Sequence, residues 1–353
     1  MKLLITVVFG ALLAALPISA FANNACKAPA IITAADVTTS DGSEYRVETY
    51  YRSPKEAATR FITDATTTMA VEGAFAWSRQ GATESLAGDN EKRFVIGHQF
   101  HALAFYFEQI AKDIAGVTDV SFGGQDYVGL QGTYPNEGTI TLLESTDNRP
   151  YALILNLPEE SEITVAFDDW RAAAGKKELP YALTVTHEGR EFYYRYSDVS
   201  FFEGDVGKDA IDFHEAITAP GIDEINIHRL HRALMTAHCR GDAEMMARLT
   251  APTGIVASRG EIFETTREQT LSRFASVFSR VDYTGYHDLK DPLVELANSR
   301  DIGWIVVNPL AEGRENESGE LFSTQWAWVM LVRKLDGVWL NAGNASNLKQ
   351  PPE

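Results

Sequence analysis

The sequence predicts an α+β protein: an antiparallel meander with helices beside it, followed by a second domain of helices and strands. Three observations lead to this fold class. Short runs rich in β-branched and aromatic residues, separated by turn residues, fill 117–202. An apolar face recurs at helical spacing over 227–238. Further strand-like runs begin at 281 and include the tight turn Asp336-Gly337.

The first 22 residues have the features of an export signal. Lys2 gives a positive start, an apolar run covers 3–16, and Ala-Phe-Ala at 20–22 has the small-x-small pattern that a signal peptidase cleaves. The apolar run is shorter than the roughly 20 residues that span a bilayer. We therefore expect cleavage after Ala22, no transmembrane segment in the mature chain, and a soluble bacterial protein that is periplasmic or secreted.

Charge and length limit the partners and the number of domains. The chain of 353 residues has a formal net charge of -18 and no basic cluster. Phosphate binding depends on grouped Lys and Arg, so we expect no nucleic-acid partner. Removal of the signal leaves 331 residues (353 minus 22) and takes away one positive charge, that of Lys2. At about 150 residues for each domain, this length indicates two domains.

The predicted organisation is a signal peptide at 1–22, a first domain at 45–203, a linker at 204–222 and a second domain at 223–347. The linker is acidic and is interrupted by glycine and proline, which favour a domain boundary. A polar stretch precedes the first domain at 33–44.

Two helices are predicted in the first domain. One covers 53–71, because a proline stands in its first turn and Ala, Arg and Met follow. The other covers 98–114, where apolar side chains recur at helical spacing. Strand-like runs lie at 74–79 and 93–96. The strands of the meander are expected at 139–143, 151–157, 162–167, 181–187 and 191–201.

The second domain is predicted to begin with a helix that ends near Gly241. Asp242 is a suitable N-cap for a short helix that follows, and a third helix covers 265–278. The remaining segments have strand patterns, at 281–289, 294–296, 302–311, 321–334 and 338–342.

Two cysteines are present, Cys26 and Cys239. In an exported protein they form a disulfide if their Cα atoms lie within bridging distance. The alternative is a buried thiol at Cys239 with Cys26 unpaired. Both alternatives stay open on sequence grounds.

The second domain resembles a known superfamily. Over 225–346 the expected elements follow the order helix, short helix, strand, helix and antiparallel strands. Gly241-Asp242-Ala243 follows the first helix, and the final run 333–339 reads Arg-Lys-Leu-Asp-Gly-Val-Trp. This order and these motifs are similar to the SnoaL-like, nuclear transport factor 2-like (ketosteroid isomerase-like) cone fold. The resemblance implies a sheet curled around helices that leaves a conical, mostly apolar cavity. Members of this superfamily include ketosteroid isomerase-like enzymes, polyketide cyclases and many proteins without catalysis.

The isomerases of this superfamily need a carboxylate base inside the cone and an oxyanion donor, because they abstract a proton beside a carbonyl. In this chain the segment 253–260 reads Thr-Gly-Ile-Val-Ala-Ser-Arg-Gly, with no acid where the base is expected. The missing acid weighs against an enzyme.

The first domain resembles the LolA-like half-barrel of periplasmic lipoprotein carriers, over roughly 50–202. Its turn-separated strands carry the resemblance, with Phe-Asp-Asp-Trp-Arg at 167–171 and Leu-Pro-Tyr at 179–181. The resemblance implies a curved antiparallel sheet with covering helices, whose concave apolar face accepts an acyl chain.

Candidate catalytic residues are few. His238 lies on the apolar face of the first helix of the second domain and is the candidate base, with Tyr283 or Tyr286 as hydrogen-bond donor. Such a base needs an orienting group, and the candidates are His287 and Asp288. A histidine that is simply packed in the core is the favoured interpretation.

Large apolar residues are the candidates for lining a ligand pocket. Trp326, Trp328 and Met330 alternate on one strand face, which packs in the core, lines the cone or forms a dimer face. Core packing is the favoured of these three. The candidate pocket residues are Trp304, Trp326, Trp328 and Trp339 in the second domain, and Phe100 and Phe107 in the first.

No cofactor and no metal are expected. His98 with His101, and His228 with His231, each share a helix face, but two ligands do not make the usual three or four of a zinc site. No nucleotide-binding loop, serine-hydrolase elbow or zinc-protease helix is present in the sequence.

The leading functional hypothesis is an exported, non-catalytic protein that binds a hydrophobic small molecule, a lipid or a lipoprotein in an apolar cavity. One alternative is a SnoaL-like isomerase, cyclase or hydrolase acting on a small molecule in the cone. The other is an interaction module that forms a homodimer through the cone sheet.

Overall fold

The computed structural model describes residues 26, 30–54, 56–72, 75–81, 83–134, 138–145, 149–157, 161–172, 178–202, 222–258 and 260–348. The predicted signal peptide at 1–22 lies outside these residues, as does the predicted linker at 204–222 except for Ile222. Within the described part of the chain, no helix is long and apolar enough to cross a membrane.

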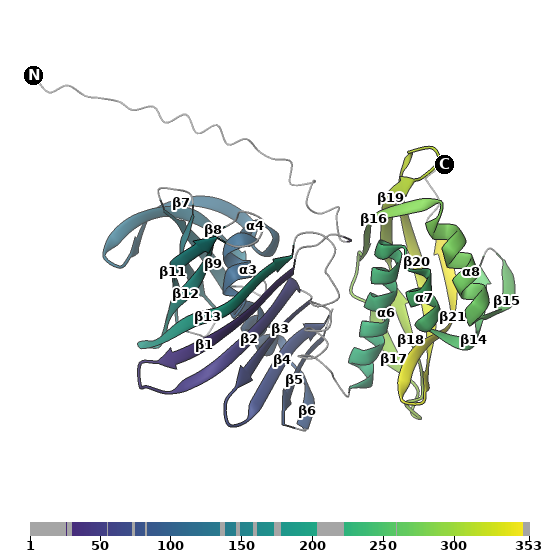
Figure 1. Cartoon of the computed structure of the whole chain (residues 1–353), viewed down its shortest axis with the longest axis horizontal. Helices are drawn as coiled ribbons and strands as arrows, with labels where there is room; N and C mark the ends of the chain where they lie inside the picture. Colours follow the sequence, from purple (N-terminus) through teal and green to yellow (C-terminus); the bar gives the residue numbers. More distant parts are fainter. Residues whose placement is uncertain are drawn as a thin grey trace, which may run out of the picture.

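Residues 30–202 form one antiparallel sheet of thirteen strands in the order β6-β5-β4-β3-β2-β1-β13-β12-β11-β10-β9-β8-β7 (Figure 1). The chain starts in the middle of the sheet, runs outward to β6, and crosses to the far edge at β7. It then returns strand by strand to β13, which pairs with β1. The strands are β1 (Ala30–Thr39), β2 (Glu44–Ser53), β3 (Glu56–Ile62), β4 (Thr66–Glu72), β5 (Phe75–Gln80), β6 (Thr83–Ala87), β7 (Lys112–Phe122), β8 (Gln125–Tyr134), β9 (Gly138–Glu144), β10 (Pro150–Asn156), β11 (Ile163–Ala172), β12 (Glu178–His187) and β13 (Arg190–Phe202).

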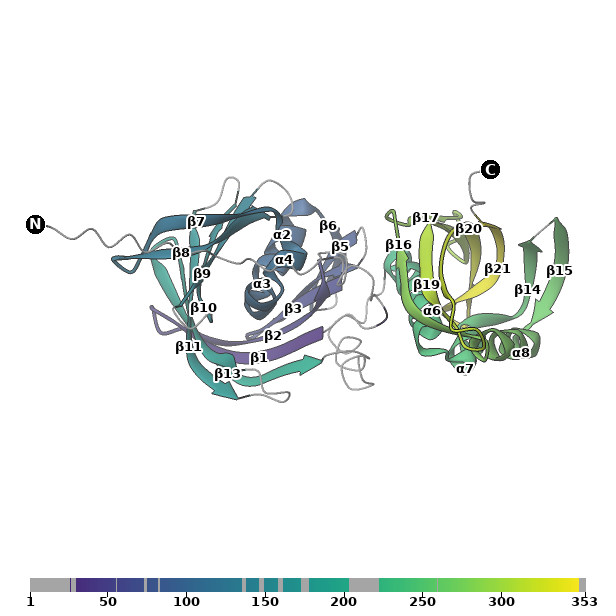
Figure 2. The ribbon, with the colours of Figure 1, turned by 90° about the horizontal axis from the view of Figure 1, so that it is seen from above.

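Three short helices lie on the concave face of this sheet: α2 (Asp89–Gly97), α3 (Phe100–Phe105) and α4 (Phe107–Ile110). Figure 2 shows the sheet curving around them. Leu103 and Phe107 from the helices are buried in one apolar cluster with Leu153 and Val165 from the strands. The curved antiparallel sheet with covering helices is therefore present, while the closer likeness to lipoprotein carriers stays a prediction.

The helix predicted over 53–71 is wrong, because this segment forms the paired strands β3 and β4. Ala57 packs into the concave cluster, whereas Ala58 packs into a second cluster on the convex face. Local alanine content favours a helix, but small side chains also suit a strand that is buried on both faces. The β-branched run of threonines at 66–68 further favours the strand.

Other boundaries in this half also differ from the prediction. The polar stretch at 33–44 belongs largely to β1, a central strand, so the sheet begins well before residue 45. The run at 93–96 is part of α2 and is not a strand. The helix predicted over 98–114 divides into α3 and α4 and gives way to β7 at Lys112.

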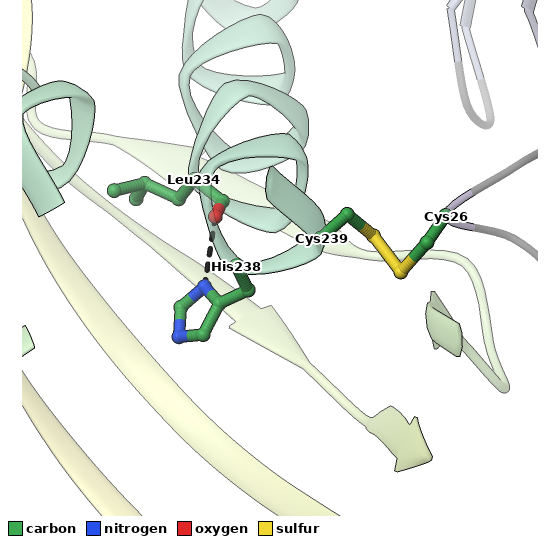
Figure 3. Close-up of a disulfide and its surroundings, with 4 residues drawn as sticks. All are labelled: Cys26, Leu234, His238 and Cys239. Carbon is green, nitrogen blue, oxygen red and sulfur yellow. Dashed lines mark hydrogen bonds between the residues drawn. A yellow bond between two sulfur atoms is a disulfide. The ribbon is translucent and has the colours of Figure 1, made fainter. Parts of the chain in front are cut away.

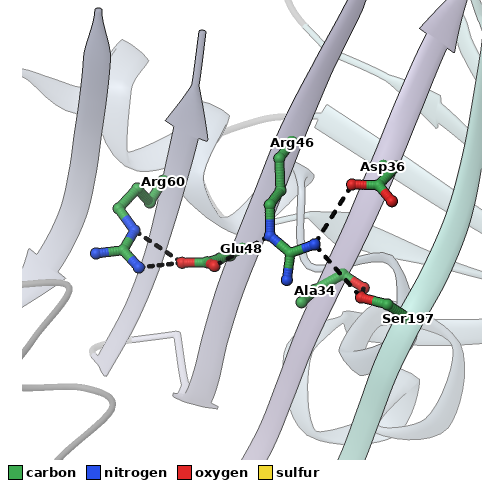
Figure 4. A network of polar contacts seen from close by, with 6 residues as sticks. All are labelled: Ala34, Asp36, Arg46, Glu48, Arg60 and Ser197. Atoms are coloured by element: carbon green, nitrogen blue, oxygen red, sulfur yellow. Dashed lines mark hydrogen bonds and ion pairs between the residues drawn. The ribbon is translucent and has the colours of Figure 1, made fainter.

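The convex face of the N-terminal sheet has a polar part that spans β1, β2 and β3. Arg46 Nη1 lies 3.3 Å from Asp36 Oδ1, and Arg60 Nε donates to Glu48 Oε2 at 2.8 Å (Figure 4). Partly exposed pairs of this kind contribute at most about 1 kcal/mol each. The rest of this face is apolar, and the helix that begins at Asp223 packs on it.

Residues 222–348 form a second sheet with three helices, α6 (Asp223–Arg240), α7 (Ala243–Arg248) and α8 (Arg267–Phe278). The strand order is β15-β14-β21-β20-β18-β17, and β19 pairs with both β20 and β16. The sheet curls over the helices (Figure 2). Its strands are β14 (Thr250–Ser258), β15 (Glu261–Thr266), β16 (Val281–Asp288), β17 (Leu293–Leu296), β18 (Ile302–Val307), β19 (Pro309–Glu315), β20 (Leu321–Leu335) and β21 (Val338–Leu348). An α+β class describes both halves of the chain, although strands predominate.

The helix boundaries of this half are largely confirmed. Gly241 ends α6 with a left-handed φ of 61°, and the Asp242 side chain accepts a hydrogen bond from the backbone N–H of Met245. The predicted strand 302–311 is instead two strands, broken at Asn308, because β20 pairs with β18 along one part of its length and with β19 along the other. Strand β15 was not predicted, and its last two residues fall within the helix predicted over 265–278.

Helix α6 is covered on two sides, and one side faces the N-terminal sheet. Ile225 is fully buried in the convex apolar cluster with Tyr50 and Trp77. The ring of His228 packs edge-on against Phe75, with ring centroids 4.9 Å apart. Because these contacts involve strands of the first sheet, α6 joins the two halves of the protein.

The other side of α6 faces the second sheet. Ile227, Leu234 and Ala237 are buried there with Ile305 and Met330. The helix therefore contributes side chains to two separate apolar clusters.

Both ends of α6 are fixed by specific bonds. At its start, the buried Asp223 carboxylate accepts hydrogen bonds from Lys334 Nζ at 2.7 Å, Trp339 Nε1 at 2.8 Å and Arg300 Nε at 3.1 Å. Burial opposes ionisation of Asp223, but these donors outweigh it and lower the pKa of the carboxyl. Near its end, Cys239 is joined to Cys26 by a disulfide, with the Cα atoms 5.0 Å apart (Figure 3).

We expect that removal of the disulfide destabilises the protein strongly. The bridge closes a loop across 213 positions of sequence. Constraint of the unfolded chain by so long a loop is worth about 3 to 5 kcal/mol. Thermal unfolding of a Cys26→Ser/Cys239→Ser double variant checks this, with wild-type protein in dithiothreitol as the matching control. An unfolding midpoint of the wild type that is unchanged by reductant contradicts the expectation.

We expect Asp223→Asn to lower the free energy of unfolding by about 3 kcal/mol, because it leaves Lys334 without its buried anionic partner. Urea unfolding of the variant measures this loss. Asp336→Asn is the control, since Asp336 lies exposed in the β20–β21 turn with a φ of 50° that asparagine also adopts. Equal losses in the two variants would count against a special role for Asp223.

Candidate functional site

A cavity of about 510 Å³ lies between the helices of the C-terminal half and its curved sheet. Thr324, Trp326, Trp328 and Met330 of β20 line it. These side chains share one face because successive residues of a strand point to opposite sides. The row lines the cavity, and Met330 and Trp328 also pack in the apolar core, so two of the three interpretations given for it describe these side chains. Tyr283 and Tyr286 of β16 add two further aromatic rings to the wall.

His238 faces this cavity from α6 and is a neutral ring. It is only 8% exposed, and its Nδ1 lies 2.8 Å from the carbonyl oxygen of Leu234 (Figure 3). A carbonyl only accepts, so this partner assigns the proton to Nδ1 and leaves Nε2 as an unprotonated acceptor. Burial lowers the pKa of His238 to about 4, although the Leu234 hydrogen bond opposes this.

Aromatic rings surround His238. Its ring stacks on Tyr286 with centroids 4.5 Å apart and meets Phe274 edge-on at 5.3 Å and Tyr283 at 5.7 Å. Burial also raises the pKa of both tyrosines above the usual value. Both hydroxyls therefore stay protonated at neutral pH and are available as donors.

The expected carboxylate partner of His238 binds another histidine. Asp288 Oδ2 lies 2.9 Å from Nε2 of His231, which is 1% exposed and lies two turns before His238 on α6. This pair was not predicted, although the spacing of seven residues places His231 and His238 on the same side of a helix. Among the described residues, a backbone carbonyl is thus the group that orients His238, with no carboxylate to strengthen it as a base.

Two of the predicted pocket tryptophans, Trp326 and Trp328, line the cavity, whereas Trp304 and Trp339 do not. Trp304 is 38% exposed on the outer face of β18, because the buried residues of that strand are its neighbours Gly303 and Ile305. Trp339 is buried in the core with its indole bound to Asp223.

The outer face that carries Trp304 also exposes Val306, Val329 and Leu331 on neighbouring strands. This is the sheet through which the sequence analysis expects a homodimer, and that homodimer stays a prediction. Phe100 and Phe107 lie far from the cavity in sequence and structure, in the apolar core of the N-terminal half.

The histidines that share helix faces in pairs contact other groups. His98 Nδ1 binds the Phe94 carbonyl oxygen and His101 Nε2 binds that of Pro180, each at 2.8 Å. His228 packs against Phe75, on the side of α6 that faces the first sheet. Within the described ranges, no group of three or more His, Cys, Asp or Glu side chains is placed to hold a metal ion.

A cation that the sequence analysis missed also lines the cavity. Helix α8 presents Thr270, Arg273, Phe274 and Val277 to it, which is the i, i+3, i+4, i+7 pattern of one helix face. The Arg273 guanidinium lies over the Phe274 ring at 4.9 Å from its centroid. Burial lowers the pKa of Arg273, yet arginine stays charged at neutral pH. The helical pattern within 265–278 is the sequence signal from which Arg273 could have been predicted.

The site thus combines a broad apolar wall with a neutral acceptor and one guanidinium. Such a set of groups can hold a small molecule by burying its apolar surface and bonding its polar end. Proton abstraction additionally requires a general base, and such a base works best when its pKa lies near the working pH.

No protein-family model and no curated protein matches this sequence. Solved structures match about a third of it. A ketosteroid isomerase-like protein from Erwinia carotovora atroseptica is 18% identical with a TM-score of 0.30, over 36% of this chain and 98% of that one. A nuclear transport factor 2-like superfamily protein from Salmonella enterica serovar Typhimurium is 7% identical with a TM-score of 0.34, over 37% and 94%. These proteins carry the fold name that the resemblance of 225–346 implies. With TM-scores below 0.5 and identities below 25%, they establish neither a family nor an activity.

We expect the stability of the protein to fall between pH 6.5 and pH 4, partly because of His238. The unfolded histidine binds a proton near pH 6.5, whereas in the folded protein it does so only near pH 4. The unfolded state therefore gains protons first as the pH falls, and the folded state loses on the order of 3 kcal/mol across this window for such a residue.

Urea unfolding of a His238→Gln variant at pH 7, 6, 5 and 4 checks this expectation. Its stability should depend on pH less steeply than that of the wild type, by up to about 1.4 kcal/mol per pH unit in this window. Arg333→Gln, on an exposed position of β20, should keep the wild-type slope. Parallel curves for His238→Gln and the wild type would show that His238 does not titrate in this way.

Proposed function

We propose that the C-terminal half binds a small, mostly apolar molecule in its cavity without transforming it, and that the protein does so after export from a bacterial cytoplasm. The observation that carries this proposal is the aromatic wall of a cavity of about 510 Å³. Cavities that bind small molecules in proteins have volumes of roughly 300 to 1,000 Å³ and mostly apolar walls with a few polar groups.

The composition of the wall supports an apolar ligand. The sheet contributes Trp326, Trp328 and Met330 to the wall, and α8 contributes Phe274 and Val277. An aromatic or aliphatic body placed there gains about 25 cal/mol for each Å² of apolar surface removed from water. Threonine and asparagine side chains in the remaining wall offer hydrogen bonds to a polar end.

Binding is favoured over catalysis by the state of His238. Its Nδ1 hydrogen is committed to the Leu234 carbonyl, and Asp288 is bonded to His231. A histidine with a pKa of about 4 is a weak base, which gives little driving force for removal of a proton from carbon. His238 therefore gives little support to a SnoaL-like isomerase, cyclase or hydrolase, and the one carboxylate that lines the cavity in the described residues, Glu261, lies at the exposed start of β15.

Export is supported by the sequence features of residues 1–22 and by the Cys26–Cys239 disulfide. Disulfides persist in oxidising compartments such as the bacterial periplasm and are rare in the cytosol. A protein that carries an apolar molecule through an aqueous compartment needs a site that shields it from water. The cavity of the C-terminal half offers such a site.

We expect the wild type to bind N-phenyl-1-naphthylamine, an uncharged apolar fluorophore, and Thr324→Phe to weaken this binding. The new ring fills part of the cavity, since Thr324 lines it. The neighbouring Ser323→Phe is the matched control, because Ser323 is exposed on the opposite face of β20. Fluorescence titration should give a roughly tenfold (about 1.4 kcal/mol) loss of affinity in the first variant and none in the second. Equal binding by both variants, or no binding by the wild type, would sink the proposal.

A further inference from the structure

Arg273 is the guanidinium of the cavity wall, and no described residue forms an ion pair with it. Two side chains with a formal charge at neutral pH line the cavity in the described part of the chain, Arg273 and Glu261. Glu261 lies at the exposed start of β15, and no ion pair joins it to Arg273. Within the described residues, the Arg273 guanidinium is therefore free to pair with an acidic group of a ligand.

The charge of Arg273 acts on neighbouring groups of the cavity wall. Its guanidinium lies over the Phe274 ring, and its charge is close enough to His238 to contribute to the low pKa of that ring. Burial by the surrounding protein also lowers the pKa of Arg273. Arg273 as a whole residue is exposed to solvent, so an acidic group that enters the cavity can reach its guanidinium.

His238 cannot serve as the missing counter-charge. It is neutral at neutral pH, and its protonation would add a second positive charge to the same wall. The tyrosines of the wall are neutral as well, because burial raises the pKa of Tyr283 and Tyr286. Neither His238 nor these tyrosines therefore offers an anion to Arg273 at neutral pH.

We propose that the ligand of this cavity is an amphipathic anion, an apolar ring or chain that bears one acidic group, and that Arg273 binds this group. A carboxylate suits a guanidinium best, because its two oxygens match the parallel N–H donors of arginine. The apolar body then lies against Trp326, Trp328 and Met330. This inference rests on the proposed function, and it adds the chemical class of the ligand.

Two probes of equal shape separate charge from apolar burial. Naphthalen-1-ylacetate and naphthalen-1-ylacetamide differ in the carboxylate, which the amide replaces by a neutral group. Both are titrated at pH 7.5 into the full mature chain by calorimetry, with tryptophan fluorescence as a second readout. The wild type should bind the carboxylate at least tenfold (about 1.4 kcal/mol) more tightly than the amide.

Variants of Arg273 test whether this residue causes the preference for the carboxylate. Arg273→Gln should reduce the affinity for the carboxylate to that for the amide and leave the amide affinity unchanged. Arg273→Lys should keep part of the preference, because it retains the charge but loses the two-pronged geometry. Arg333→Gln removes the same charge from an exposed position on β20 and should leave both affinities as in the wild type.

The outcomes distinguish the two proposals. If N-phenyl-1-naphthylamine binds but the wild type shows no preference for the carboxylate, the anionic ligand class is wrong and the apolar site stands. A preference that survives in Arg273→Gln, or that is lost equally in Arg333→Gln, also overturns the role of Arg273. If none of the three probes binds, the proposed function and this inference fail together.

Discussion

The packing of α6 between two sheets is the constraint on which the rest of the structure depends. Residues of an α-helix advance by 100°, so Ile225 and Ile227 point to nearly opposite sides. Ile225 fills the apolar part of the convex face of the first sheet, and Ile227 fills the core under the second. Arg232 lies 3.8 Å from Glu56 of the first sheet, on the side of Ile225. A helix with a single apolar stripe could not hold both halves.

The position of the cavity follows from this helix. His238 and Cys239 are neighbours that point away from each other, so the disulfide holds one side of the last turn while the imidazole enters the cavity on the other (Figure 3). Asp223 ties the first turn to Trp339 and Lys334, which lie beside the β20–β21 turn. Movement of either end of α6 would therefore shift the ring that lines the site.

Sequence reasoning found those features that depend on local pattern. The last turn of α6 at Gly241 and the alternation along β20 were predictable because each is set by neighbouring residues. Which face of a strand packs against the core depends on the tertiary fold and not on the strand's own residues. Trp304 was therefore predicted to line the cavity, although it lies on the outer face of β18. The helix expected over 53–71 failed for a related reason, since α6 buries the second face of β3 from another part of the chain.

Burial lowers the pKa of both nitrogen bases of the site, but at neutral pH it leaves only His238 uncharged. Withdrawal from water keeps His238 uncharged, which makes it a poor base, while Arg273 is too basic to lose its proton and so retains its charge. The charge of Arg273 itself further disfavours protonation of the nearby imidazole. A catalytic acid–base pair needs groups that exchange protons near neutral pH. A ring that is neutral at neutral pH and a permanent cation agree instead with the proposed ligand, an anion whose body is apolar.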